Sequence, residues 1–77
     1  MSKMLKVKPI FPLSLEIDYD NGEKRLFNMA RYCKSEFFKE LTNWEYFKQV
    51  IIKNHTISWP NEQDVAPETV LIDSKKI

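Results

Sequence analysis

The chain has few of the residues that carry covalent or metal chemistry. Its 77 residues include one cysteine, one histidine and one glycine. The single thiol, Cys33, cannot form an internal disulfide, so we expect a reducing, cytoplasmic setting. Neither Cys33 nor the only imidazole, His55, has a partner at the spacing of a zinc site, and one glycine cannot build a phosphate-binding loop. We therefore expect no cofactor, no metal and no enzymatic activity.

Long apolar runs and an excess of one charge are also missing. The longest aliphatic runs, 50–52 and 70–72, are far shorter than the roughly 20 apolar residues of a membrane helix. No apolar segment of signal-peptide type follows the basic start of the chain. Twelve basic and eleven acidic side chains give a formal charge of +1, which provides no general field for a polyanion. We expect a soluble protein with no membrane contact.

Aromatic residues are abundant, with five Phe, three Tyr and two Trp. Each can bury roughly 150–250 Å², which helps so short a chain to close a core. The length and the ordinary balance of 43% hydrophobic and 30% charged residues predict a single domain over residues 1–77. We expect an ordered core over residues 4–72 and a frayed tail over residues 73–77.

Two segments near the start alternate with the period of a β-strand. Leu5 and Val7 alternate with Lys6 and Lys8, and prolines follow, which predicts an exposed edge strand with one apolar face. The next strand places four apolar side chains on one face: Leu13, Leu15, Ile17 and Tyr19.

Residues 20–22 form the strongest turn signal, because they include the only glycine. A two-residue loop would leave Phe27 on the polar face of the hairpin. A three-residue loop with Gly22 in the left-handed conformation pairs Leu15 with Phe27 instead. The second register buries one more large side chain, a gain of roughly 1.5–3 kcal/mol, and is preferred. Nearby carboxylates are interpreted as turn residues rather than cation ligands: Asp18, Asp20 and Glu23.

Residues 35–49 change to a helical pattern that predicts two short turns. In the first turn, Phe37 and Leu41 are four apart and would share a face. Either Thr42 or Asn43 begins the second turn as its N-cap.

A second hairpin follows, with residues 54–55 as a tight turn. This register pairs Ile52 with Ile57 and Val50 with Trp59, so four apolar groups meet on one face. The pattern therefore predicts that this pairing is buried.

Pro67 fits the first turn of a last helix, which Val70 and Leu71 would anchor. Asp64 and Glu68 lie near this start, where they favour turn and cap formation. The alternative is an acidic patch beside an aromatic ring. The whole pattern predicts an α+β fold, in which a small antiparallel sheet built from two hairpins has two or three short helices packed on one face.

The closing segment resembles the bacterial family known as Domain of Unknown Function 2442. The residues that support this resemblance are Trp59, Pro60, Asn61, Asp64, Ala66, Pro67, Glu68 and Leu71, and the likeness extends over residues 5–72. Two departures are Glu62 and Gln63, where the family usually has Gly and Ala, and Asn28 replaces a frequent Asp. The resemblance implies a compact α+β domain and no activity. It also suggests a regulatory or toxin–antitoxin-like partner role.

The leading hypothesis is a non-catalytic protein-interaction or regulatory module, the partner of a small neighbouring gene product, acting as monomer or homodimer. The alternative is a toxin–antitoxin-like or transcription-associated regulator with weak nucleic-acid contact through the terminal lysines, Lys3, Lys6, Lys8, Lys75 and Lys76. The expected interaction surface consists of Lys6, Lys8, Trp59, Asp64 and Glu68.

Overall fold

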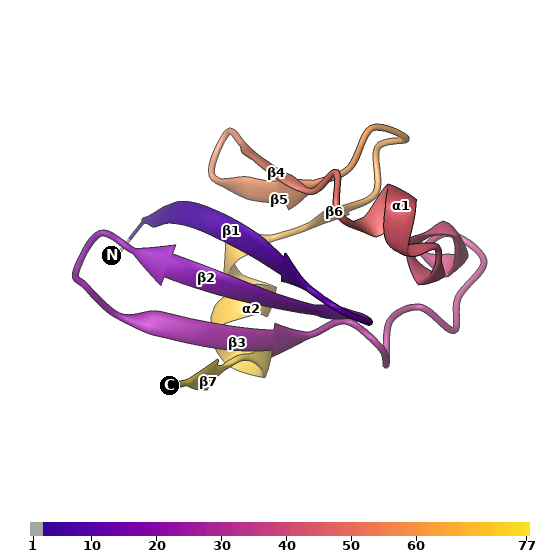
Figure 1. Cartoon of the computed structure of the whole chain (residues 1–77). Helices are drawn as coiled ribbons and strands as arrows, with labels where there is room; N and C mark the ends of the chain where they lie inside the picture. Colours follow the sequence, from indigo (N-terminus) through magenta and orange to yellow (C-terminus); the bar gives the residue numbers. More distant parts are fainter. Residues whose placement is uncertain (1–2) are drawn as a thin grey trace.

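The computed structural model describes residues 3–77, which form two antiparallel sheets and three short helices (Figure 1). The four-stranded sheet has the order β1 (Met4–Ile10), β2 (Ser14–Tyr19), β3 (Lys24–Asn28) and β7 (Lys75–Lys76). The three-stranded sheet has the order β4 (Ile51–Lys53), β5 (Thr56–Ser58) and β6 (Asp64–Val65). The helices are the 3-10 helix η1 (Lys39–Thr42) and the α-helices α1 (Trp44–Phe47) and α2 (Pro67–Asp73).

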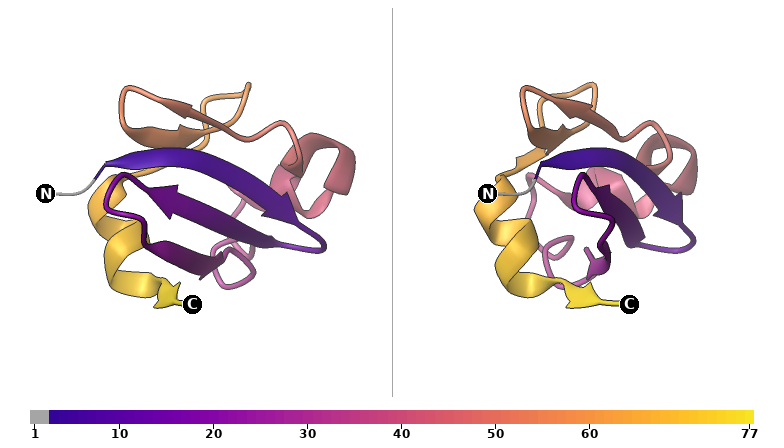
Figure 2. Two further views of the ribbon diagram at one scale, coloured as in Figure 1. Left: turned by 60° about the vertical axis from the view of Figure 1, so that its left-hand side comes forward. Right: turned by 90° about the vertical axis from the view of Figure 1, so that its left-hand side faces the viewer.

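The α+β class is thus confirmed, but two sheets replace the single sheet that we expected. The second hairpin packs beside β1 without pairing to it, so the two hairpins belong to different sheets (Figures 1 and 2). Helix α2 lies against one face of the four-stranded sheet, while η1 and α1 lie near the β1–β2 turn (Figure 2). None of the helices within residues 3–77 has the length and apolar character that a membrane crossing requires.

The first hairpin has the preferred register. Leu15 pairs with Phe27, and both side chains are fully buried. Gly22 has a φ of 85°, the left-handed conformation expected at the end of a three-residue loop. The prediction for β2 and β3 is therefore confirmed.

The prediction for β1 is wrong at Leu5, which is 61% exposed. The pairing of β1 with β2 shifts register between Met4 and Lys6, so the alternation is interrupted there and Met4 becomes the buried residue. Val7 keeps its expected side and packs against the core.

The second hairpin also has the expected register, with Ile52 opposite Ile57. Its turn residues, Asn54 and His55, both have positive φ, which matches the twist of a two-residue hairpin loop. Trp59 is 2% exposed and belongs to the core.

The helical segment differs in one respect from the sequence prediction. Asn43 is the N-cap of α1, because its side chain accepts a hydrogen bond from the N–H of Glu45 (3.0 Å). Leu41 is fully buried but Phe37 is 55% exposed, so the two do not share a face. The segment forms turns and a 3-10 helix, in which residues four apart no longer align.

The C-terminal segment is more ordered than we expected. Pro67 begins α2, as predicted, and Val70 is fully buried. Leu71 is 41% exposed, because α2 turns only one narrow face toward the core. In the segment 73–77, where we expected a frayed tail, β7 pairs with β3 and the N–H of Ile77 donates to the carbonyl of Lys24 (3.0 Å).

Candidate functional site

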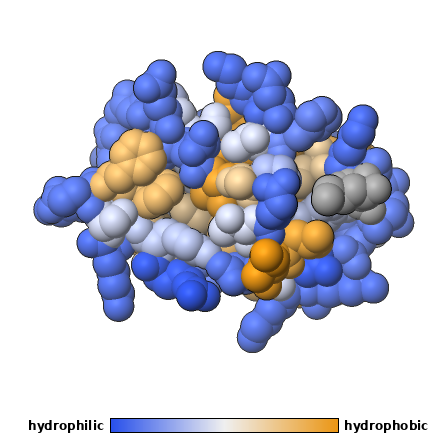
Figure 3. Space-filling view, turned by 180° about the vertical axis from the view of Figure 1, so that it is seen from behind, coloured by the Kyte–Doolittle hydropathy of each residue, from blue (hydrophilic) through white to orange (hydrophobic). Residues whose placement is uncertain are grey.

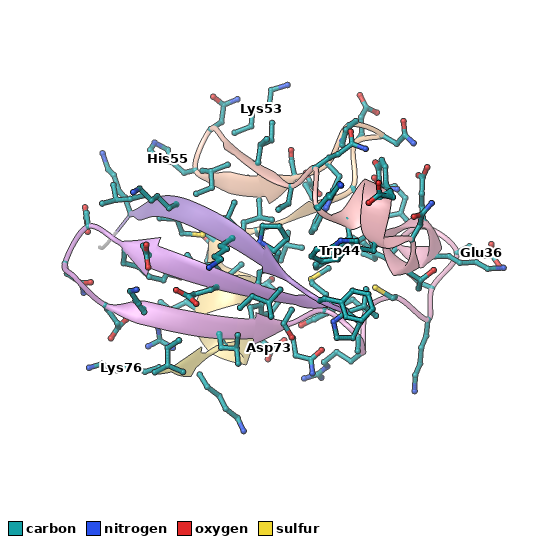
Figure 4. All side chains as sticks on the ribbon, in the orientation of Figure 1. Glu36, Trp44, Lys53, His55, Asp73 and Lys76 are labelled. Atoms are coloured by element: carbon teal, nitrogen blue, oxygen red, sulfur yellow. The ribbon has the colours of Figure 1, made fainter. Side chains whose placement is uncertain are left out.

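An exposed aromatic pair lies where the β1–β2 turn meets α1. The ring of Phe11 meets the ring of Trp44 edge-to-face, with centroids 5.4 Å apart and an interplanar angle of 76°. Phe11 is 70% exposed and Trp44 is half-buried. Figure 4 labels Trp44 at the base of α1. We call Phe11 and Trp44 the aromatic tip.

The aromatic tip is supported from inside by two further rings. Trp44 packs on Phe47 with centroids 6.0 Å apart, and Phe47 stacks on Trp59 with centroids 5.7 Å apart. The indole N–H of Trp59 donates to the carbonyl of Phe47 (2.9 Å). Because Phe47 and Trp59 are buried, they hold Trp44 in place from behind.

Trp59 is therefore a core residue, and its assignment to the interaction surface is a correction that its 2% exposure requires. The hairpin register already predicted Trp59 opposite Val50 on a buried face, and its place in the interaction surface followed only from the alternative of an acidic patch beside an aromatic ring. The burial follows from β5, whose alternation turns Ile57 and Trp59 to the same inner side.

A polar cluster fixes the loop that follows Trp59. The side-chain amide of Asn61 lies 2.9 Å from both carboxylate oxygens of Glu40, and the amide of Gln63 donates to the same carboxylate (3.0 Å). The hydroxyl of Tyr46 accepts from the backbone N–H of Asn61 (2.7 Å) and donates to Gln63 Oε1 (2.6 Å). We call Glu40, Tyr46, Asn61 and Gln63 the amide clamp.

The amide clamp joins the β5–β6 loop to η1 and α1. The hydrogen bonds from Asn61 and then Gln63 lower the pKa of Glu40 below its ordinary value. Sequence reasoning missed Gln63, which is 3% exposed, because a glutamine in a polar loop gives no sign of burial. The hydrogen bonds of the cluster therefore act as a structural link between this loop and the two helices.

The other expected surface residues do not form one site. Lys6 and Lys8 lie on the same face of β1, and their register places them opposite Asp18 and Glu16 of β2. This charge pairing across strands is typical of a solvated sheet face. Two further exposed carboxylates lie on separate elements: Asp64 on β6 and Glu68 on α2.

One of the two lysines near the C-terminal end, Lys76, forms an ion pair. The ammonium group of Lys76 lies 3.4 Å from a carboxylate oxygen of Glu23, whose other oxygen is 2.9 Å from Arg25. Arg25 is the main cause of a lowered pKa at Glu23, with a smaller contribution from Lys76. This pairing reduces the free positive charge at one of the two ends that would contact a nucleic acid.

The single thiol and the single imidazole lie in different connections: Cys33 between β3 and η1, and His55 between β4 and β5. Cys33 is 7% exposed, and burial raises the pKa of its thiol, so it is a poor nucleophile. His55 is exposed at the β4–β5 turn (Figure 4). Across residues 3–77, His, Cys, Asp and Glu side chains form no group of three or more that could hold a metal ion.

The aromatic tip is one of two exposed aromatic pairs among the described residues; the other is Phe37 and Phe38, with ring centroids 5.0 Å apart and Phe37 55% exposed. The face opposite to Figure 1 is mainly hydrophilic, with separate orange areas rather than one continuous apolar surface (Figure 3). Isolated hydrophobic side chains of this kind are normal on a protein surface.

Comparison with protein families identifies the class. The family model of a protein of unknown function, DUF2442, matches residues 4–75, so the chain belongs to this family. The resemblance drawn from the closing segment is thereby confirmed. No curated protein matches the chain. No solved structure matches it either.

Proposed function

We propose that this protein is a non-catalytic interaction module that binds a protein partner through the aromatic tip. The observation that carries this proposal is the edge-to-face pair of Phe11 and Trp44, with Phe11 70% exposed. Aromatic side chains are enriched at the centres of protein interfaces, where they anchor the complex. The partner we propose is the product of a small neighbouring gene, and the role is regulatory.

The packing behind the tip supports this proposal. Phe47 and Trp59 hold Trp44 against the core, so the ring loses little conformational freedom when a partner covers it. A second possible route, in which a partner adds a strand at the edge of β1, is less favourable because β4 packs beside that strand. In this proposal the two hairpins and the short helices form the frame that presents the tip.

The test is a direct binding measurement with the purified neighbouring gene product, using isothermal titration calorimetry. Phe11→Ala should weaken the complex at least about tenfold, because it removes an anchor ring from the interface. Ile72→Ala is the matched control, since Ile72 is 78% exposed and lies on α2. It should leave the affinity unchanged.

Two results would contradict the proposal. One is equal affinity for the wild type and Phe11→Ala. The other is a wild-type chain that forms no complex with the neighbouring product and sediments as a monomer. Circular dichroism of Phe11→Ala must match the wild type, which excludes unfolding as the cause of a lost complex.

A further inference from the structure

A second surface feature lies on the outer side of the three-stranded sheet, separate from the aromatic tip. It is an open hollow of about 460 Å³. Six polar residues line it: Lys53, Asn54, Thr56, Ser58, Glu62 and Asp64.

The strand register explains how these side chains meet. Lys53 on β4 is opposite Thr56 of β5, and Asp64 on β6 is opposite Ser58 of β5. Lys53 therefore lies on one edge strand of the sheet, β4, and Asp64 lies on the other edge strand, β6. The two hydroxyl groups of the middle strand lie between them. Glu62, at the end of the β5–β6 loop, adds a second carboxylate to the lining.

The charges of the hollow are not used inside the protein. Within residues 3–77, the side chains of Lys53, Glu62 and Asp64 make no ion pair and no hydrogen bond. Other acidic residues do make such contacts, as Glu16 does with Lys24 (3.5 Å). The hollow thus offers free groups of both signs at separated positions, together with hydroxyl groups that can donate or accept hydrogen bonds.

We propose that this hollow binds a small molecule that carries an amine at one end and a carboxylate at the other. The ammonium group faces Glu62 and Asp64, the carboxylate faces Lys53, and the hydroxyl groups of β5 bind the polar atoms between. This site does not depend on the aromatic tip. Figure 4 shows Lys53 at the β4–β5 turn and Trp44 on α1, at separate places on the molecule.

Three probes of one carbon skeleton test the proposed ligand class: 4-aminobutyrate, butylamine and butyrate. Amide chemical shifts of the full chain are followed by nuclear magnetic resonance during titration with each probe. The doubly charged probe should give saturable shifts at residues of β4, β5 and β6, with a Kd of about 1 mM or lower. Each singly charged probe should bind at least about tenfold more weakly, because it satisfies one charge only.

Two variants test which residue contacts each charged end of the ligand, and two others serve as controls. Lys53→Met should remove the preference for 4-aminobutyrate over butylamine, and Glu62→Gly should weaken 4-aminobutyrate about tenfold or more. Glycine accepts the left-handed backbone at position 62, so this variant keeps the fold. Lys34→Met and Glu68→Gln change exposed charges outside the hollow and should leave binding unchanged.

Three outcomes would overturn the site or its ligand class. In the first, shifts grow linearly for all probes without saturation. In the second, butylamine binds as tightly as 4-aminobutyrate, which would reduce the hollow to an acidic patch. In the third, binding is intact in both Lys53→Met and Glu62→Gly.

Discussion

Gly22 and Glu62 occupy the same position in two loops of the same construction. Gly22 is the last residue of the loop 20–22, and Glu62 is the last residue of the loop 60–62. In each loop the last residue donates its N–H to the carbonyl three positions earlier, at 3.1 Å to Tyr19 and 3.0 Å to Trp59. Each has a positive φ, 85° for Gly22 and 71° for Glu62. One loop therefore uses a glycine where the other holds a side chain in a strained backbone conformation.

Glu62→Gly should stabilise the protein. A side chain in the left-handed region costs roughly 1–2 kcal/mol, and the added freedom of the unfolded chain offsets about 0.5–1 kcal/mol of the gain. We expect a free energy of unfolding up to about 1 kcal/mol higher, measured by urea denaturation. Glu62→Gln keeps the side chain and should give no such gain. Equal gains in both variants would show that charge, rather than backbone strain, limits this loop.

Gly22→Ala should have the opposite effect. No atom lies within 4 Å of a Cβ added at this position, so the substitution meets no steric obstacle outside the backbone itself. The left-handed φ alone should lower the free energy of unfolding by about 1 kcal/mol. Gly22→Asn is the control, because asparagine tolerates this conformation better, and it should lose less stability than alanine. A thermal melt in which the alanine variant equals the wild type would contradict this reasoning.

The amide clamp predicts a dependence of stability on pH. The lowered pKa of Glu40 means that the folded state binds a proton less readily than the unfolded state. The stabilisation is therefore complete above the ordinary pKa of 4.5 and is lost as the pH falls through the lower value of the folded protein. Urea denaturation at several pH values should show this loss in the wild type and a smaller one in Glu40→Gln.

Glu23, whose pKa is also lowered, contributes in the same direction and should account for part of the loss that remains. Parallel loss of stability in the wild type and Glu40→Gln on acidification would show that Glu40 does not contribute.

Trp59→Phe should be strongly destabilising although it keeps an aromatic ring. The change leaves a cavity in the core and removes the indole N–H that binds the carbonyl of Phe47 (2.9 Å). We expect a loss of about 2–4 kcal/mol in the free energy of unfolding. Trp44→Phe is the matched control, because Trp44 is half-buried, and it should cost clearly less. Similar losses in both variants would contradict the core role of Trp59.

The sequence predicted those parts of the fold where a local pattern and a turn residue agree. Gly22 and the alternation of β2 determined the register that pairs Leu15 with Phe27. The second hairpin was predicted in the same way, from Ile52 and Ile57. In each case a shift by one residue would expose the buried side chains, so the pattern alone selects the pairing.

Features that depend on distant contacts could not be predicted. The burial of Gln63 arises from its partners in η1 and α1, more than ten positions earlier in the chain. The register shift after Met4 gives no signal in the sequence, and it moved Leu5 to the surface. Nothing in the sequence indicates that Phe11 belongs to a surface site, because its contact with Trp44 forms only in the folded chain.

The pairing of β7 with β3 has a consequence for truncated forms of the chain. β7 covers Arg25 and Leu26, and the N–H of Ile77 adds a bond to Lys24. A fragment cut after Asp73 would leave the backbone groups of β3 open along that side, ready to pair with a strand of another molecule. The last few residues therefore protect the sheet against edge-to-edge aggregation, and proteolytic trimming of this end would remove that protection.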